Sequence, residues 1–381
     1  MTSLLITNGR LYDAPDGAPL SPVLIRQGMI EKVGRADRAD QMLDAGGRIV
    51  APGLIDVHIQ GAGGADVLDA APEALERMAR TCARFGVTSF LATTVYKPGQ
   101  ENRHLRVAAE CVGRDLGGAR LLGTHLEGPF ISPQKRGMIQ PDCITLPSPA
   151  VLGDIYALLG DTLKMMTVAP ELPGSADIIR TLADHGTVAS FGHSKANYDE
   201  TVRGFGMGID HVTHLFNAMA SLHHRDPGPL AAIFERPDIT CQVITDGVHI
   251  HPAVLRLAYR ALGPERFVTI TDGMHAMGLP DGHYVYNKLE YESKDGTARY
   301  KDGTLIGTAL GLSQLLARLT QFAPCSAATA IKTVTENAAQ VLGLESTKGA
   351  IAPGRDADLV ILDEDLSVHT TIVAGRVVYQ Q

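Results

Sequence analysis

Eight short runs of apolar and β-branched residues recur along the middle of the chain, with helical patterns between them. The runs are GLIDVHI, TSFLATT, ARLLGTHLE, LKMMTVAP, TVASFGH, IDHVTHLF, TCQVITD and RFVTITD. Most are apolar on both faces, which is typical of parallel strands buried beneath helices. Helical patterns lie in EALERMARTCARF, DIIRTLADH and AVLRLAYRAL. Eight strand-then-helix units predict an α/β fold, a (β/α)₈ TIM-type barrel.

The two ends of the chain show a different pattern of apolar and turn residues. The first residues hold three strand-like runs, SLLITNGRLYD, SPVLIRQGMIEKVG and GRIVAPG, broken by glycine turns. The last stretch, DADLVILDEDLSVHTTIVAGRVVYQ, is similar, with Ala374-Gly375 at a hairpin position. We therefore expect both ends, residues 1–50 and 351–381, to form one small β-sandwich domain beside a catalytic barrel over 51–350. A β-hairpin insert is expected over 283–307, followed by closing helices over 310–322 and 327–344.

Composition excludes several other classes of protein. The chain has 381 residues, 45% of them hydrophobic, which is ample for a large core. Its net charge of −8, without a dense Lys/Arg patch, argues against a nucleic-acid partner. No apolar run approaches the ~20 residues of a membrane helix, and the N-terminus has no signal-peptide pattern, so no membrane association is expected. Five widely spaced cysteines without a CxxC predict reduced thiols and a cytoplasmic protein.

Histidines and acids collect where the eight runs end. In such a barrel the carboxyl ends of the strands form one rim, and the active site lies there. The rim residues are His58, Gln60, Glu127, His193, His214, Asp246 and Asp272, with His249 just beyond the seventh run. A single rim histidine is more often a hydrogen-bonded structural residue. This many on one rim indicate a hydrolytic metal site.

Glu127, His193 and His214 are the expected ligands of one divalent metal ion per subunit. Three protein ligands plus water is the usual arrangement at catalytic zinc. We expect Zn²⁺, with Fe²⁺, Co²⁺ and Mn²⁺ as alternatives, because two imidazoles and a carboxylate accept all of them. His58 and Gln60 mark the place of a second metal site, expected to be vestigial because a neutral amide is a poor ligand.

Asp272, at the end of the eighth run, is the expected catalytic acid/base. An acid there faces the water across the barrel mouth, and can take its proton and pass it to a leaving amine. The structural alternative is a turn or cap aspartate. Asn217-Ala218, followed by His223-His224-Arg225, offers the backbone N–H groups, imidazoles and guanidinium that suit a phosphate.

These motifs resemble those of the N-acetylglucosamine-6-phosphate deacetylase family of the amidohydrolase superfamily. The similar phrases, which span nearly the whole chain, are APGLIDVHIQGAGG, HLEGPF, FGHSKA, HVTHLFNAM, HHRDPG, ITDGVHIHP, TDGMHAMGLPDG and GAIAPGRDADLVILD. The resemblance implies a (β/α)₈ barrel with a small β domain built from both ends. It also implies metal-dependent hydrolysis of N-acetyl-D-glucosamine 6-phosphate to glucosamine 6-phosphate and acetate, in amino-sugar catabolism.

The resemblance implies a role for individual residues. Glu127, His193 and His214 match the metal ligands, and Asp272 matches the catalytic acid/base. The implied substrate-binding set, with Asp246 added from the seventh run, is Met138, Ile139, Asn217, Ala218, Arg225, Asp246, His249, Leu305, Ile306 and Gly307. Arg225 resembles a residue that reaches into the neighbouring subunit's site, which implies a homodimer.

Two departures from the family pattern concern the amino sugar. The family's Gly-x-His is here Gly137-Met138-Ile139, and the loop 307–312 also differs. N-acetylgalactosamine 6-phosphate is therefore the alternative substrate, and His275 is a candidate to replace the missing histidine.

Two other hypotheses stay open. Another amidohydrolase, acting on an amide or cyclic amide, commonly needs His-x-His or a barrel lysine, and both are missing here. A catalytically silent scaffold is opposed by the intact set Glu127, His193, His214 and Asp272.

Overall fold

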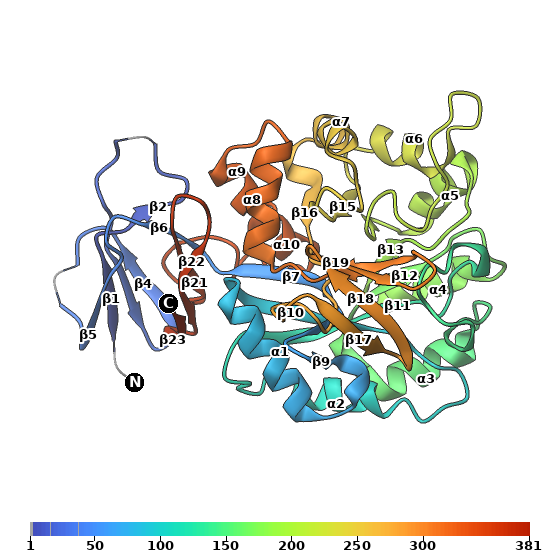
Figure 1. Ribbon diagram of the computed structural model, residues 1–381, viewed down its shortest axis with the longest axis horizontal. Helices are drawn as coiled ribbons and strands as arrows, with labels where there is room; N and C mark the ends of the chain where they lie inside the picture. Colours follow the sequence, from blue (N-terminus) through green and yellow to red (C-terminus); the bar gives the residue numbers. More distant parts are fainter. Residues whose placement is uncertain (1–2, 16, 37) are drawn as a thin grey trace.

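The computed structural model describes residues 3–15, 17–36 and 38–381, and its largest part is a parallel barrel (Figure 1). Each of the eight apolar runs supplies one strand. The strands are β7 (Leu54–Ile59), β10 (Val87–Thr94), β11 (Arg120–Glu127), β12 (Leu163–Val168), β13 (Val188–Phe191), β14 (His211–Val212), β15 (Thr240–Val243) and β16 (Phe267–Thr269), paired in this order. The ring closes where Ile59 bridges Gly273 in parallel and Asp272 N–H donates to His58 O over 2.9 Å. The predicted (β/α)₈ barrel is confirmed.

Helices cover the outer face of this barrel. They are α1 (Pro72–Arg84), α2 (Arg103–Cys111), α3 (Pro149–Leu159), α4 (Ser175–Asp184), α5 (Tyr198–Met207), α6 (Gly228–Glu235), α7 (Pro252–Leu262) and α8 (Leu312–Phe322). In α1, Leu75, Met78 and Cys82 are buried at helical spacing against the strands. Asn197 and Glu200 form a reciprocal capping box that fixes the start of α5.

The helix expected over 327–344 is instead two short helices, α9 (Ala327–Lys332) and α10 (Glu336–Val341). The backbone carbonyls at the break accept hydrogen bonds from strands of the barrel. Thr333 O accepts from Thr269 N–H, and Val334 O accepts from Ile55 N–H. Because these carbonyls bond to β16 and β7, they cannot continue a helix.

The two chain ends meet in a smaller β region, where blue and red strands lie side by side in Figure 1. One sheet holds β4 (Met29–Val33), β3 (Val23–Arg26), β1 (Leu4–Thr7) and β5 (Gln41–Asp44). The other holds β2 (Arg10–Leu11), β6 (Ile49–Pro52), β21 (Leu359–Leu362), β22 (Val368–Val373) and β23 (Arg376–Gln380). Antiparallel pairing of β6 with β21 joins the ends, and Ile6, Ile25 and Ile372 share one buried core, as a sandwich requires.

The insert after the eighth strand is a four-stranded antiparallel sheet rather than a single hairpin. Its strands are β17 (Gly282–Tyr286), β18 (Leu289–Lys294), β19 (Thr297–Tyr300) and β20 (Leu305–Thr308). Thr308 N–H donates to Asp272 O over 2.9 Å, which ties β20 to the barrel rim.

Two shorter strands, β8 (Gly61–Ala62) and β9 (Ala65–Asp66), follow β7. Within the described residues, no helix is both long and apolar enough to cross a membrane.

Candidate active site

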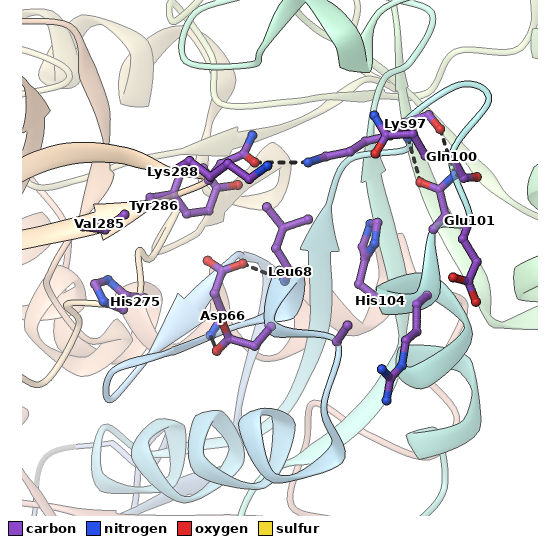
Figure 2. A pocket seen from close by; sticks show the side chains of 15 residues that line it. Asp66, Leu68, Lys97, Gln100, Glu101, His104, His275, Val285, Tyr286 and Lys288 are labelled. Atoms are coloured by element: carbon purple, nitrogen blue, oxygen red, sulfur yellow. Dashed lines mark hydrogen bonds between the residues drawn. The ribbon is translucent and has the colours of Figure 1, made fainter.

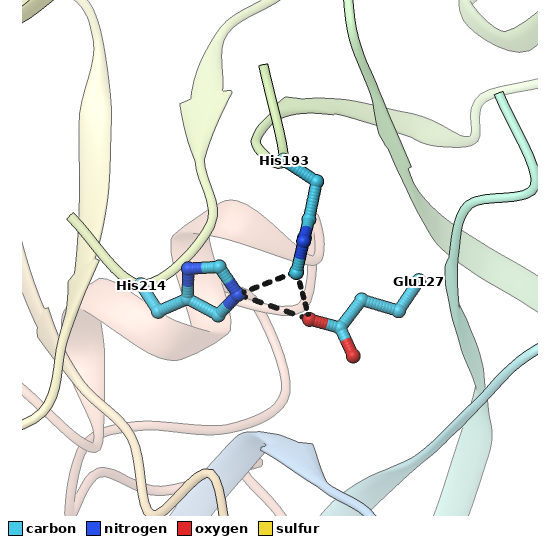
Figure 3. Close-up of side chains that lie close together, drawn as sticks. All are labelled: Glu127, His193 and His214. Carbon is cyan, nitrogen blue, oxygen red and sulfur yellow. Dashed lines mark hydrogen bonds and ion pairs between the residues drawn. The ribbon is translucent and has the colours of Figure 1, made fainter. Parts of the chain in front are cut away.

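Glu127, His193 and His214 meet at the carboxyl rim of the barrel (Figure 3). Glu127 Oε1 lies 2.8 Å from His193 Nε2 and 2.9 Å from His214 Nε2. The two Nε2 atoms lie 3.0 Å apart, and all three side chains are buried. Glu127 ends β11, whereas the two histidines follow β13 and β14. Three donor atoms thus converge on one point.

The chemistry of this donor set fits a divalent cation. His193 Nδ1 lies 2.8 Å from Lys135 O, and a carbonyl can only accept, so Nδ1 carries the proton. In the neutral ring Nε2 then presents a lone pair toward the Glu127 carboxylate, which is also an acceptor. A cation between these two acceptors satisfies both. The hydrogen bond from Nδ1 to Lys135 O is also typical of metal-binding histidines, in which it fixes the orientation of the ring.

The backbone at these positions is unusual. His193 and Asp272 both have φ of 47°, and His214 has φ of 25°, in the left-handed region that few non-glycine residues adopt. Hydrogen bonds hold the His193 segment in place. Ser194 Oγ donates to Glu171 Oε2 over 2.6 Å, and Lys195 N–H donates to Glu171 Oε1 over 2.8 Å. Backbone strain of this kind persists only where surrounding contacts maintain it, and it is found most often at functional sites.

Asp272 lies beside the place of the expected second metal. Its Oδ1 is 3.3 Å from His58 Nε2 and 3.4 Å from Gln60 Nε2, and the same Gln60 nitrogen is 3.4 Å from Glu127 Oε2. His58 Nδ1 lies 2.9 Å from Gln242 Oε1. Gln60 Nε2 therefore donates to both acids, which is the opposite of what a metal ligand does. His58 Nε2 lies within ion-pair distance of Asp272 and makes no hydrogen bond within the described residues.

Charges inside the site favour ionised carboxylates. Burial alone raises the pKa of Glu127, but the adjacent His193 and His214 lower it well below its ordinary value. Burial likewise raises the pKa of Asp272, and the charge of His58 brings it below its ordinary value. Burial lowers the pKa of His58, but the neighbouring acids, Asp272 foremost, raise it to about 9. Asp272 thus has the proton-free form that a base needs.

A cavity of about 120 Å³ opens onto these groups. Its lining residues are Gln60, Glu127, Gly137, Met138, His193, His214, Asn217, Ala218, His249, Asp272, Leu305, Ile306 and Gly307. The structure therefore brings the four candidate chemical residues together with seven of the ten candidate substrate-binding residues. Such a volume is small beside the ~300–1,000 Å³ common for small-molecule pockets.

Three candidate substrate-binding residues do not line this cavity. Ile139 is buried in a separate apolar cluster with Val95 and Ile131. Asp246 is also buried and accepts hydrogen bonds from His249, through its backbone N–H and through Nδ1 at 2.7 Å. Asp246 therefore orients His249 rather than facing the cavity. Arg225 is exposed, outside the cavity wall.

His275, the candidate replacement for the missing histidine, also lies elsewhere. Its Nδ1 is 2.5 Å from the Tyr291 hydroxyl, and it lines a different cavity. Sequence reasoning missed the part played by Glu171 in holding the His193 segment. Its place at the end of the fourth run was the available signal, because that position puts a side chain on the same rim.

Comparison with known proteins agrees with this geometry. The amidohydrolase family model matches residues 49–285 and 293–378. A Bacillus subtilis N-acetylglucosamine-6-phosphate deacetylase is 37% identical over 87% of this chain and 85% of its own. An Escherichia coli O157:H7 N-acetylgalactosamine-6-phosphate deacetylase is 34% identical over 86% and 87%. A Mycobacterium smegmatis N-acetyl-D-glucosamine-6-phosphate deacetylase, an aspartate-to-alanine variant solved with N-acetyl-D-glucosamine 6-phosphate, superposes with a TM-score of 0.89 at 31% identity, covering all of both chains.

Proposed function

The chain belongs to the amidohydrolase family, and we propose that it hydrolyses N-acetyl-D-glucosamine 6-phosphate to glucosamine 6-phosphate and acetate. The observation that carries this proposal is the convergence of Glu127, His193 and His214 beside Asp272 on one cavity. These three ligands would hold one divalent ion, Zn²⁺ first, with Fe²⁺, Co²⁺ and Mn²⁺ as alternatives. When bound, the ion supplies a Lewis acid that polarises the acetamide carbonyl and acidifies water.

Asp272 moves the proton. As a carboxylate it accepts a proton from the attacking water while oxygen bonds to the acetyl carbon. The same carboxylic acid then donates that proton to the amide nitrogen as the C–N bond breaks, releasing the amine and acetate. His58 and Gln60, at 3.3 and 3.4 Å from Oδ1, hold the carboxyl group in position during both transfers.

The sugar phosphate would be bound at the mouth of the cavity. His249 is oriented by Asp246, so its Nε2 can donate to a phosphate oxygen when the ring is protonated. Ala218 lines the cavity with φ of 52°, and within the described part of the chain its N–H has no acceptor. A backbone N–H and an imidazolium on one wall suit a phosphate.

We further propose that the enzyme is a homodimer in which Arg225 reaches the neighbouring subunit's phosphate. The 120 Å³ cavity suits the reacting acetamide end better than a whole sugar phosphate, and Arg225 is exposed on the loop beyond it. Mixing Arg225→Ala chains with Asp272→Asn chains should restore activity in mixed dimers, because one of their two sites is then intact. No recovery after demonstrated subunit exchange would place Arg225 in its own chain's site.

Acetate release is the test of the proposed reaction. The metal-loaded enzyme should release acetate from N-acetyl-D-glucosamine 6-phosphate, without ammonia release or ring opening of cyclic amides. N-acetylgalactosamine 6-phosphate is the second candidate substrate, favoured by the departure of Gly137-Met138-Ile139 from the family's Gly-x-His and by the Escherichia coli O157:H7 relative. The kcat/KM values for the two epimers decide between them. A cytoplasmic location follows for such an enzyme, because charged sugar phosphates do not cross membranes unaided.

A further inference from the structure

A second cavity, of about 470 Å³, lies where the segments that follow β7 and β10 meet the insert sheet (Figure 2). Its walls come from the short helix η1 (Val67–Asp69), the segment after β10, and the β17–β18 hairpin. It shares no lining residue with the catalytic cavity. We propose that this cavity is a second ligand site, for a small phosphorylated polyol. The inference does not depend on the proposed deacetylase activity.

Three cationic side chains provide the anion-binding part of the site. Lys97, Arg103 and Lys288 all line the cavity, and none forms an ion pair within the described residues. Lys97 Nζ donates to Asn287 Oδ1 over 3.1 Å, which holds it against the hairpin. In Figure 2 the side chains of Lys97 and Lys288 extend toward each other from opposite walls. Two ammonium groups arranged in this way suit a phosphate.

Asp66 provides the part of the site that would recognise a hydroxyl group. Its side chain is only 6% exposed, and it lines the cavity beside Leu68. Oδ1 accepts from Leu68 N–H over 2.8 Å, whereas Oδ2 is buried without any partner. Buried polar atoms are nearly always hydrogen-bonded, so an unpartnered one at a cavity wall points to a missing partner. A hydroxyl group of a polyol supplies that partner, since it can accept from a protonated carboxyl and donate to an ionised one.

The acids of the cavity do not cancel its cations. Burial raises the pKa of Asp66 to about 8, so at neutral pH this carboxyl is mostly uncharged and does not repel an anion. Asp69 accepts from Asp66 N–H over 3.0 Å and is thereby held at the start of η1. Glu101 is exposed at the rim. The wall near Lys97 and Lys288 therefore remains positive.

Lys288 occupies an unfavourable backbone position. Asn287 and Lys288 form the two-residue turn between β17 and β18, with φ of 44° and 68°. Glycine is the favoured residue at the second position of such a turn, because it has no Cβ to strain. Lys288→Gly therefore removes the charge and relaxes the turn, which makes it a variant expected to fold.

The wall between the two cavities is continuous apolar packing. Tyr286 lines the second cavity and belongs to one buried cluster with Met138 and Ile306, which line the catalytic cavity. A ligand against Tyr286 would therefore contact the packing that shapes the catalytic site.

Calorimetric titration of the metal-loaded enzyme with glucose 6-phosphate tests the site. This probe has a phosphate and hydroxyl groups but no acetamide to hydrolyse. We expect two ligands per chain. Lys288→Gly and Lys97→Met should each weaken one of them at least about tenfold, which corresponds to one lost charged hydrogen bond. His249→Gln should weaken only the other, and Lys294→Met, on the same sheet but outside the cavity, should change neither.

Three results would overturn the proposal in whole or in part. A single ligand per chain, abolished by His249→Gln, would mean that the second cavity binds nothing of this class. Unchanged binding in both lysine variants would show that the cations do not contact the ligand. If inorganic phosphate binds there as tightly as glucose 6-phosphate, Asp66 does not hydrogen-bond a hydroxyl group of the ligand, and the site binds phosphate alone.

Discussion

Nε2 of His193 and Nε2 of His214 lie 3.0 Å apart in a buried site. Glu127 Oε1 is within 2.9 Å of both nitrogens. Since the His193 proton is donated to Lys135 O, its Nε2 lone pair and the Glu127 oxygen face each other as two acceptors. Such an arrangement is stable when a cation lies between the acceptors.

The first prediction is that either histidine is needed for metal retention. His193→Ala or His214→Ala leaves two protein ligands, so bound metal should fall far below one ion per chain. Activity should fall in parallel, and elemental analysis of the purified protein measures the metal. His283→Ala, at an exposed histidine that lines neither cavity, is the matched control and should keep both. Full metal content in either ligand variant would contradict the assignment.

The second prediction concerns Glu171, which holds the residues that follow His193. Glu171→Ala leaves Ser194 Oγ and Lys195 N–H without their acceptor, so the His193 segment should loosen. Loss of such a supporting contact typically costs 10–100-fold in metal affinity. Competition with a chelator measures this affinity. Asp177→Ala, at an exposed acid on α4, serves as the control. Equal affinities in the two variants would show that Glu171 does not position the ligand.

The third prediction concerns the pair Asp246 and His249. Asp246→Asn weakens the charged hydrogen bond that orients His249. The value of kcat/KM for the phosphorylated substrate should fall about 10- to 100-fold, as expected for one charged hydrogen bond. N-acetylglucosamine without phosphate should lose much less. Equal losses for both substrates would mean that His249 does not bind the phosphate.

The fourth prediction is a pH dependence of stability caused by Asp66. Burial raises its pKa in the folded chain to about 8, whereas an unfolded aspartate titrates near ~3.9. Between these values the folded state holds a proton that the unfolded state has lost, so this residue makes stability fall as pH rises. Asp66→Asn keeps an oxygen for the Leu68 N–H but does not titrate. The Tm of the variant relative to the native chain should therefore rise from pH 5 to pH 8.5. A constant difference across that range would show that Asp66 is ionised throughout.

The barrel and the convergence of the candidate metal ligands were predictable because both depend on a regular rule. The carboxyl ends of parallel strands share a rim, so Glu127 and His214, which lie 87 residues apart in the sequence, meet there. The break between α9 and α10 was not predictable in this way. It exists because Thr333 and Val334 give their carbonyls to distant strands, and no local pattern records such contacts.

Side-chain direction limited the prediction of the remaining site residues. Asp246 follows β15 at the same spacing as Asp272 follows β16, but the Asp246 carboxylate accepts hydrogen bonds from His249, three residues later. Ile139 follows Met138 directly, yet only Met138 faces the catalytic cavity. Which of two neighbouring side chains turns inward depends on the packing of Val95 and Ile131 around it, and the sequence alone does not give that packing.

The last prediction concerns the proton transfer at Asp272. An acetamide resists hydrolysis because resonance stabilises its carbonyl and an amine is a poor leaving group, so a proton must reach the nitrogen as the bond breaks. The pKa of Asp272 is held below its ordinary value by His58, so the residue begins as a carboxylate and can accept the proton of water. Asp272→Asn suits the φ of 47° at this position, because asparagine tolerates the left-handed region well.

The variant keeps the side-chain shape and loses only the titratable oxygen. We therefore expect native metal content and nearly native substrate affinity, with kcat lower by about 10²–10⁴-fold, the usual contribution of a general acid–base group. Elemental analysis measures the metal content, and single-turnover kinetics at varied substrate concentration measure the affinity and the rate of the chemical step. Met274→Leu, a neighbouring buried change that leaves the carboxylate intact, controls for disturbance of the rim. Turnover of Asp272→Asn within a few-fold of native would make Asp272 a structural residue. The proton would then have to pass through another group. Glu127 is a poor substitute, because its Oε1 already contacts both His193 and His214.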